Sequence, residues 1–128
     1  MIERISPPGV PEPRGPYSPA VRAGDFIYIS GQVPIDPATG KIVSGDIGTE
    51  TRQVLTNIKT NLAGCGATMA DVVKTSVYLT EAQDFAGMNA VYAEFFGEAK
   101  PARTTVTVAA LPLQGAKVEI DAIAYKPK

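Results

Sequence analysis

Histidine is absent from this chain of 128 residues, and its absence excludes more chemistry than any other feature of the composition. Without an imidazole there is no Ser-His or Cys-His nucleophile pair, no His-ligated zinc or haem, and no side chain whose ordinary pKa lies near neutral pH. Tryptophan is also absent, and the one cysteine is Cys65. Any catalysis must therefore depend on carboxylates, arginine, lysine, tyrosine, hydroxyls, backbone amides and water.

The chain also lacks an excess of basic charge and a long hydrophobic run. Its net charge is −1 and its pI is about 5.4, which argues against nucleic-acid binding because such binding depends largely on a basic surface. A single cysteine cannot form an intrachain disulfide. The first residues do not resemble a signal peptide, and no apolar run approaches the roughly 18 residues of a membrane helix. We therefore expect one cytoplasmic domain over residues 1–128, without a metal ion, a nucleic-acid partner or a membrane partner.

Prolines are concentrated in residues 6–19, which hold six of the eleven in the chain. Each proline fixes its own φ and removes an amide donor, so this segment is predicted to be an extended loop rather than a helix or an inner strand. The loop is either a solvated connector or a functional element. Its length and its lone aromatic residue, Tyr17, favour function.

Hydrophobic patterning predicts an α+β domain in the order β-β-β-α-β-α-β-β, with two helices covering one face of a sheet. Gly24-Asp25 is typical of a tight turn between the first strands, and Gly64-Cys65-Gly66 is typical of a helix end. Helices are predicted over residues 48–63 and 85–96. Strands are predicted over residues 20–23, 26–30, 72–79, 103–109 and 117–125.

Alternation along the last two strands predicts which side chains share a face. The apolar face of the final strand consists of Val118, Ile120, Ala122 and Ala124, and Val106 shares a face with Thr104. If both of these faces lie under the helices, Arg103 and Glu119 lie together on the opposite face, with Tyr28 and Ser30. That face mixes aromatic, hydroxyl and charged side chains, and a symmetric oligomer is the simplest way to cover it.

An arginine and a glutamate on one face of adjacent strands have two interpretations. One is an ordinary cross-strand ion pair. The other is a site for a small carboxylate, in which the Arg103 guanidinium binds the carboxylate in a bidentate manner and Glu119 holds or activates a water molecule. The spacing alone leaves both open.

Eight segments, in order along nearly the whole chain, resemble the Rid (RidA/YjgF) family of reactive-intermediate deaminases. The resemblance implies a chorismate-mutase-like sheet and a homotrimer whose sheets line a central barrel, with active sites between subunits. Shared fold does not transmit function, so chorismate mutase activity is not indicated. The segments are Gly15–Val21, Ile29–Gln32, Thr51–Ile58, Asp71–Thr75, Met88–Asn89, Tyr92, Pro101–Arg103 and Val118–Ile120.

The resemblance further implies a 2-iminobutanoate/2-iminopropanoate deaminase, which hydrolyses enamine/imine acids such as 2-aminoacrylate to a 2-oxo acid and ammonia without a cofactor. Arg103 would bind the substrate carboxylate, and Glu119 would position the attacking water. The remaining pocket residues implied by the resemblance are Tyr17, Ser30, Gly31, Asn89 and Thr105.

Two departures from the family pattern bear on these assignments. Thr105 stands where many deaminating members have cysteine, which excludes a thiol role there and bears on substrate choice. The turn at Leu113–Ala116 is one residue longer than usual. Because a slip of one residue would reverse the faces of the strand, we expect the loop to absorb the extra residue so that Glu119 keeps its orientation.

Two other functions compete with the deaminase. A non-catalytic module for small carboxylates such as 2-oxo acids would use the same Arg103, and Glu119 is the one proposed residue that binding alone does not require. A ribonuclease or translation inhibitor is the third hypothesis. The acidic pI and the lack of a basic and aromatic patch weigh against it.

Overall fold

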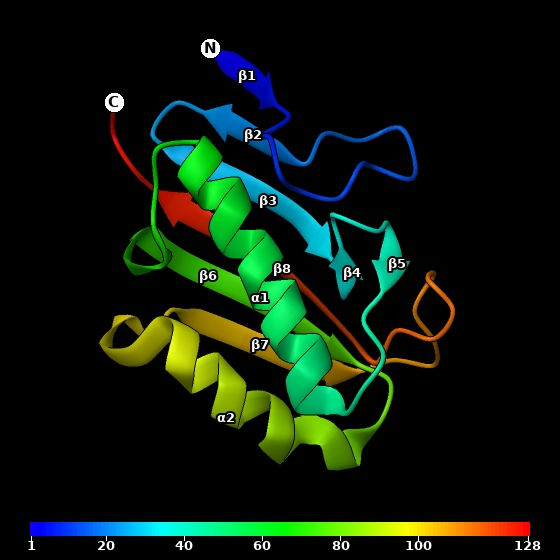
Figure 1. Cartoon of the computed structure of the whole chain (residues 1–128). Helices are drawn as coiled ribbons and strands as arrows, with labels where there is room; N and C mark the ends of the chain where they lie inside the picture. Colours follow the sequence, from blue (N-terminus) through cyan, green and yellow to red (C-terminus); the bar gives the residue numbers. More distant parts are fainter.

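The computed structural model describes all of residues 1–128 and has two helices packed on one face of a six-stranded sheet (Figure 1). This confirms the predicted α+β class. The helices are α1 (Ile47–Gly64) and α2 (Phe85–Phe96). The strands of the large sheet are β1 (Ile2–Ile5), β2 (Ala20–Ala23), β3 (Phe26–Gln32), β6 (Val72–Leu79), β7 (Ala102–Thr107) and β8 (Val118–Tyr125).

Some short elements lie outside the predicted ranges. Besides β1, they include a two-stranded sheet, β4 (Ile35–Asp36) and β5 (Lys41–Ile42), which stands beside the main sheet in Figure 1. Three single 3₁₀ turns occupy Met69–Asp71, Ala82–Asp84 and Gly97–Ala99. No helix of the molecule combines the length and the apolar character needed to cross a membrane.

The strand order of the large sheet is β1-β2-β3-β8-β6-β7. All neighbouring pairs are antiparallel except β6 and β7, which are parallel and are connected through α2. The prediction that the strands of Arg103 and Glu119 are neighbours is therefore wrong, because β6 lies between β7 and β8. The helical crossover places β7 at the sheet edge, beyond β6, whereas β8 pairs with β3 and β6 in the centre.

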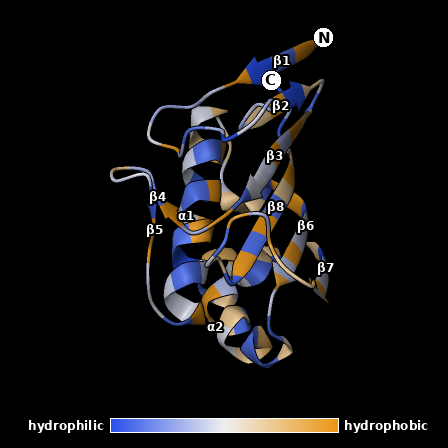
Figure 2. Ribbon diagram, turned by 90° about the vertical axis from the view of Figure 1, so that its right-hand side faces the viewer, coloured by the Kyte–Doolittle hydropathy of each residue, from blue (hydrophilic) through white to orange (hydrophobic).

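The core lies between α1, α2 and the covered face of the sheet. On α1 the apolar side chains, which recur at helical spacing, are fully buried, and β8 presents its predicted apolar face to them. Figure 2 shows this alternation of hydrophobic and hydrophilic residues along the strands and the absence of a helix on the other face. The buried residues are Val54, Leu55, Ile58 and Leu62 of α1 and Val118, Ile120, Ala122 and Ala124 of β8.

Two buried polar side chains of α1 hold segments that lead to the functional region. Asn57 Nδ2 donates to the carbonyl oxygens of Val33 (3.3 Å) and Ile35 (2.9 Å), just after β3. Glu50 Oε1 accepts a hydrogen bond from the backbone N–H of Lys117 at 2.8 Å. Helix α1 therefore fixes both the exit from β3 and the entry into β8.

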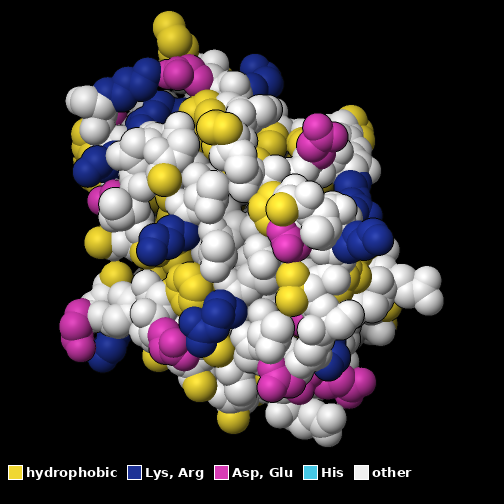
Figure 3. All heavy atoms as spheres, in the orientation of Figure 1, with side chains coloured by type: hydrophobic (Ala, Val, Ile, Leu, Met, Phe, Trp, Pro, Cys, Tyr) yellow, Lys and Arg dark blue, Asp and Glu magenta, His cyan; other side chains and the backbone are white.

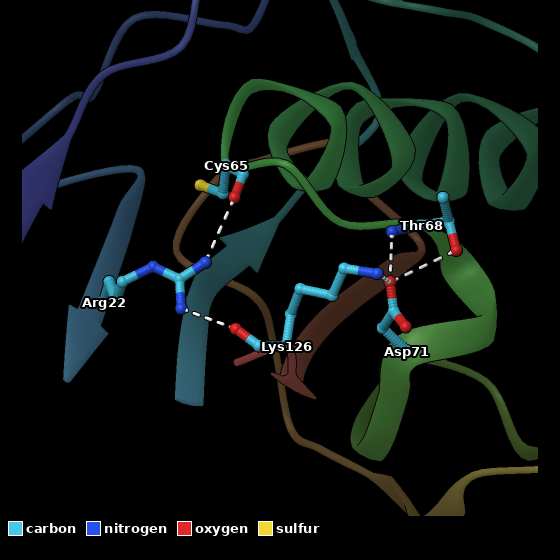
Figure 4. Close-up of polar contacts among 5 residues, drawn as sticks. All are labelled: Arg22, Cys65, Thr68, Asp71 and Lys126. Carbon is cyan, nitrogen blue, oxygen red and sulfur yellow. Dashed lines mark hydrogen bonds and ion pairs between the residues drawn. The ribbon is translucent and has the colours of Figure 1, made fainter. Parts of the chain in front are cut away.

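A second polar cluster joins β2 to the C-terminal end of α1 (Figure 4). The buried Arg22 guanidinium donates to the carbonyl oxygens of Lys126 (2.7 Å) and Cys65 (3.3 Å). Cys65 caps α1, which confirms the predicted helix end. Lys126 Nζ lies 3.9 Å from Asp71 Oδ2, which also accepts the backbone N–H of Thr68. The Arg22 guanidinium complements the helix dipole at the C-terminal end of α1. Its hydrogen bond to Lys126 also connects the last residues of the chain to the core.

Glu50→Gln is expected to stabilise the protein at neutral and alkaline pH. Burial raises the pKa of Glu50 above its ordinary value, with a further upward contribution from Asp84, while the amide and the charge of Lys117 act in the opposite direction. A carboxyl whose pKa is higher in the folded state contributes full stability below its unfolded pKa and loses it as the pH rises through the folded pKa. Glutamine keeps an acceptor for the Lys117 amide. Because it carries no charge, it avoids the cost of burying an ionised carboxylate.

The measurement is the Tm of parent and Glu50→Gln between about pH 4 and pH 8. The variant should unfold at the higher temperature at pH 8, and the difference should shrink towards pH 4. The same substitution at exposed Glu98 serves as the control and should show no such trend. A Tm difference independent of pH would contradict the assignment.

Candidate functional site

A cleft of about 530 Å³ lies at the end of β3, beside the proline-rich loop and the start of β8. Its volume falls in the range of small-molecule sites. Four of the residues predicted from the sequence line it together: Tyr17, Ser30, Gly31 and Glu119. Its other lining residues are Arg14, Val33, Pro112 and Leu113. We refer to it as the Glu119 cleft.

A β-bulge in β3 forms the floor of the Glu119 cleft. The register with β8 shifts between Ile29 and Gln32, which leaves Ser30 and Gly31 out of regular pairing. The Ser30 hydroxyl donates to the Ser18 carbonyl oxygen at 2.6 Å, and the Ser30 amide donates to the Pro19 carbonyl oxygen at 3.0 Å. The bulge therefore anchors the proline-rich loop against the cleft.

Gly31 is the point of closest approach between the bulge and Glu119. A Cβ atom built on Gly31 would overlap Glu119 Oε2. Only glycine lets the carboxylate lie directly against the backbone at this place. The missing side chain at Gly31 thus permits the close approach of Glu119 to the backbone.

Glu119 lies on the face of the sheet opposite the helices, as expected, because its neighbours Val118 and Ile120 are the buried ones. The long turn before β8 therefore leaves the orientation of Glu119 unchanged. Burial raises the pKa of the half-buried carboxyl above its ordinary value, and the nearby Asp121 raises it further. A carboxylate with a raised pKa is better suited to accept a proton than an ordinary one.

Arg103 lies elsewhere, at the edge of the sheet beside α2. Its guanidinium carbon is 4.7 Å from the ring centroid of Tyr92 and 5.7 Å from that of Phe85. Both distances are typical of cation–π contacts. The Tyr92 hydroxyl is in turn 2.7 Å from the buried Thr75 hydroxyl, so the ring is held in place.

The prediction that Arg103 and Glu119 share the uncovered face is wrong. Arg103 is in register with buried Thr75 of β6 and faces α2, whereas Glu119 faces away from the helices. Neither residue takes part in any ion pair of the structure. The interpretation of the two as a cross-strand ion pair is therefore also wrong.

The error concerns which face of β7 the helices cover. Val106 and Thr104 were expected under the helices, yet Val106 is 42% exposed and the Thr104 hydroxyl accepts a hydrogen bond from Lys74 on the other face. Alternation shows which residues share a face but not which face is covered. On this edge strand apolar Val106 lies on the uncovered face, and Arg103 lies on the covered face, where it contacts α2.

Two further predicted residues belong to the side of the sheet where Arg103 lies. Thr105 follows Arg103 by two positions on β7 and is in register with buried Val77, so it shares the covered face. Asn89 of α2 is four residues after Phe85 and three before Tyr92, which places all three on one side of the helix. We call Arg103, Thr105, Asn89, Tyr92 and Phe85 the Arg103 cluster.

Sequence reasoning missed three of the neighbours that shape these two regions. Arg14 directly precedes the Gly15-Pro16-Tyr17 segment, and its place in that loop was the available signal. Phe85 and Tyr92 lie at helical spacing in the predicted helix over residues 85–96, a pattern that is typical of core residues. Nothing local in the sequence shows that an arginine from a distant strand packs on their rings.

Gly31→Ala is expected to displace the Glu119 carboxylate and to lower the free energy of unfolding by about 0.5–1.5 kcal/mol, because the flexible Glu119 side chain must change its rotamer to avoid the added Cβ. Urea unfolding measures the loss, and a crystal structure of the variant should show the Glu119 carboxylate displaced. Gly48→Ala is the matched control, since its added Cβ would meet only ordinary contacts in α1. Unchanged stability together with an unmoved Glu119 would contradict the steric argument.

Comparisons with known proteins show what this chain is similar to. A family model described as Endoribonuclease L-PSP matches residues 9–126. The chain is 56% identical over 126 residues to a RutC family protein of Pyrococcus horikoshii, covering 98% of this chain and 99% of that protein. It is 44% identical over 119 residues to a protein of Dermatophagoides farinae named 2-iminobutanoate/2-iminopropanoate deaminase, covering 93% and 92%.

A solved structure of a Rid family protein from Yersinia pestis matches with a TM-score of 0.93 and 42% identity, covering 98% of this chain and 99% of that one. Likeness at this level extends over the sheet, both helices and the proline-rich loop. The resemblance inferred from motifs is thereby confirmed: the chain belongs to the Rid family, also called the YjgF/RutC family.

Proposed function

We propose that this protein is an enamine/imine deaminase, which hydrolyses substrates of the 2-aminoacrylate/2-iminopropanoate type to a 2-oxo acid and ammonia. The observation that carries the proposal is Arg103, whose guanidinium is held by two aromatic rings and is neutralised by no carboxylate of its own chain. Such a group is suited to bind the carboxylate of a small substrate. The name of the Dermatophagoides farinae relative supports the same reaction class.

We further propose that the complete site forms between two subunits of a homotrimer. In one chain the Arg103 cluster and the Glu119 cleft lie on opposite sides of the sheet, so a second copy is needed to bring them together. The uncovered face supports such an assembly, since its aromatic residues Tyr28 and Tyr125 are each 45% exposed. Apolar surface of this kind is typical of an interface, here the lining of a central barrel.

In the proposed reaction, Arg103 binds the substrate carboxylate and thereby orients the imine carbon. Glu119 holds a water molecule and accepts its proton as the water oxygen attacks that carbon, while the C=N electrons move to nitrogen. Glu119 then returns the proton to nitrogen, which gives a carbinolamine. It next takes the proton of the new hydroxyl as the C=O bond forms and passes it to nitrogen, so that the C–N bond breaks and ammonia leaves. No step of this scheme requires a cofactor.

The remaining predicted residues support this chemistry from both sides. Thr105 and Asn89 would line the part of the site that holds the carboxylate, next to Arg103. Ser30 and Gly31 would fix the position of Glu119 through the bulge, and Tyr17 would close the cleft. Arg103, Glu119 and their neighbours thus divide into a binding half and a water-activating half.

Two other functions are less well supported. A non-catalytic module for small carboxylates needs Arg103 but gives no reason for a half-buried Glu119 with a raised pKa against Gly31. The description of the family model names an endoribonuclease. Figure 3 shows Lys and Arg side chains scattered among Asp and Glu on the face in view, rather than gathered in a basic patch, and the net charge is −1.

Arg103→Ala and Glu119→Gln, each assembled alone, should lose activity by about 100-fold or more, because one loses the carboxylate anchor and the other the base. Refolded together in equal amounts, they should recover about a quarter of the parent activity, since every mixed trimer contains one intact site. The assay follows ammonia and 2-oxo acid formation from freshly generated 2-aminoacrylate, above the spontaneous rate.

Light scattering tests the trimer, and mass spectrometry of the intact assembly verifies that the two variants mix. Arg4→Ala, at an exposed position of β1, is the control and should behave as the parent. Verified mixed trimers without recovered activity would rule out a site shared between chains. A parent protein that binds 2-oxo acids but turns over no imine would favour the binding module.

A further inference from the structure

Arg14 is the one cationic side chain that lines the Glu119 cleft, and the proposed reaction does not use it. It is tethered at two points. Its Nη2 atom donates to the Gly40 carbonyl oxygen at 2.7 Å, and its backbone N–H donates to the Tyr17 hydroxyl at 3.2 Å. Arg14 is exposed, and these two bonds fix its guanidinium on the Gly40 carbonyl and its backbone beside Tyr17.

The rest of the cleft wall indicates what Arg14 would meet. Val33, Pro112 and Leu113 form an apolar side, and the one carboxylate in the lining is Glu119. Arg14 does not form an ion pair with Glu119. A ligand group suited to this wall has an apolar stem that contacts the three aliphatic residues and an anionic tip that contacts Arg14.

The negative charge of Glu119 determines why a cation is needed in this cleft. A second carboxylate on the substrate would be repelled by Glu119 in a cleft that lacked a cation. With Arg14 present, that carboxylate gains a charge-assisted hydrogen-bonding partner in the same space. The α-carboxylate is already assigned to Arg103, so the group that reaches Arg14 is on the substrate side chain.

We propose that Arg14 is a specificity-determining residue that binds a second, side-chain carboxylate, so that the protein prefers imino dicarboxylic acids with a short methylene stem, such as 2-iminoglutarate. This inference rests on the proposed deaminase function. It adds to that function the substrate class that the Glu119 cleft selects.

The test compares two substrates with side chains of three carbons, 2-iminoglutarate and 2-iminopentanoate, each generated freshly from its amino acid. Parent kcat/KM is expected to be about 10-fold or more higher for 2-iminoglutarate, the effect of one hydrogen bond to a charged group. Arg14→Gln should reduce this ratio by the same factor, and Arg14→Lys should retain part of it because the charge remains. Arg4→Gln is the matched control and should leave the ratio at the parent value.

Each other outcome separates this inference from the function on which it rests. A parent that hydrolyses 2-iminopentanoate but shows no preference for 2-iminoglutarate would overturn the role of Arg14 and leave the deaminase standing. An equal loss on both substrates in Arg14→Gln would also overturn it, since that is the result expected of a structural contact with Gly40 or of a contact with the α-carboxylate. A parent that hydrolyses 2-iminopropanoate but neither larger imine would overturn the inference alone, whereas a parent inactive on all three substrates would overturn the deaminase function.

Discussion

The central position of β8 is the constraint on which the rest of the molecule depends. One face of this strand packs into the core under α1, and the other carries Glu119 into the cleft. Because alternation has a period of two, a slip of one residue would bury the carboxylate and expose the core face. The hydrogen bond from Lys117 to Glu50 fixes the strand at its start, two residues before Glu119. Burial and site geometry therefore depend on the same register.

The bulge in β3 holds the proline-rich loop beside the Glu119 cleft. Backbone groups of Ser18 and Pro19 accept hydrogen bonds from Ser30, and Asn57 fixes the segment that follows β3. A loop with so many prolines offers few amide donors, so most of its attachment comes from donors elsewhere in the chain. This arrangement puts Tyr17 and Arg14 at the cleft without requiring regular secondary structure.

The separation of Arg103 from Glu119 follows from the different positions of their strands. A cation needs partners that do not neutralise it if it is to bind an anionic ligand, and the rings of Tyr92 and Phe85 supply such contacts at the sheet edge. Glu119 is partly buried and forms no ion pair within the chain, and the glycine in the bulge lets its carboxylate lie against the backbone. Within one chain the two groups therefore lie apart.

Residue patterning alone predicted the α+β class, the extents of the main helices and strands and the apolar face of β8, and the family resemblance indicated the cleft residues Tyr17, Ser30, Gly31 and Glu119. The fold class, the extents of the elements and the apolar face of β8 follow from local backbone geometry and hydrophobic periodicity, which a single chain displays directly. The cleft residues followed from the resemblance to the Rid family. Only the tertiary structure decided that β8 lies between β3 and β6, that Arg103 packs against α2, and that Arg14 reaches the cleft. Strand order and the covered side of an edge strand arise from packing between distant segments, and alternation along one strand contains no information about either.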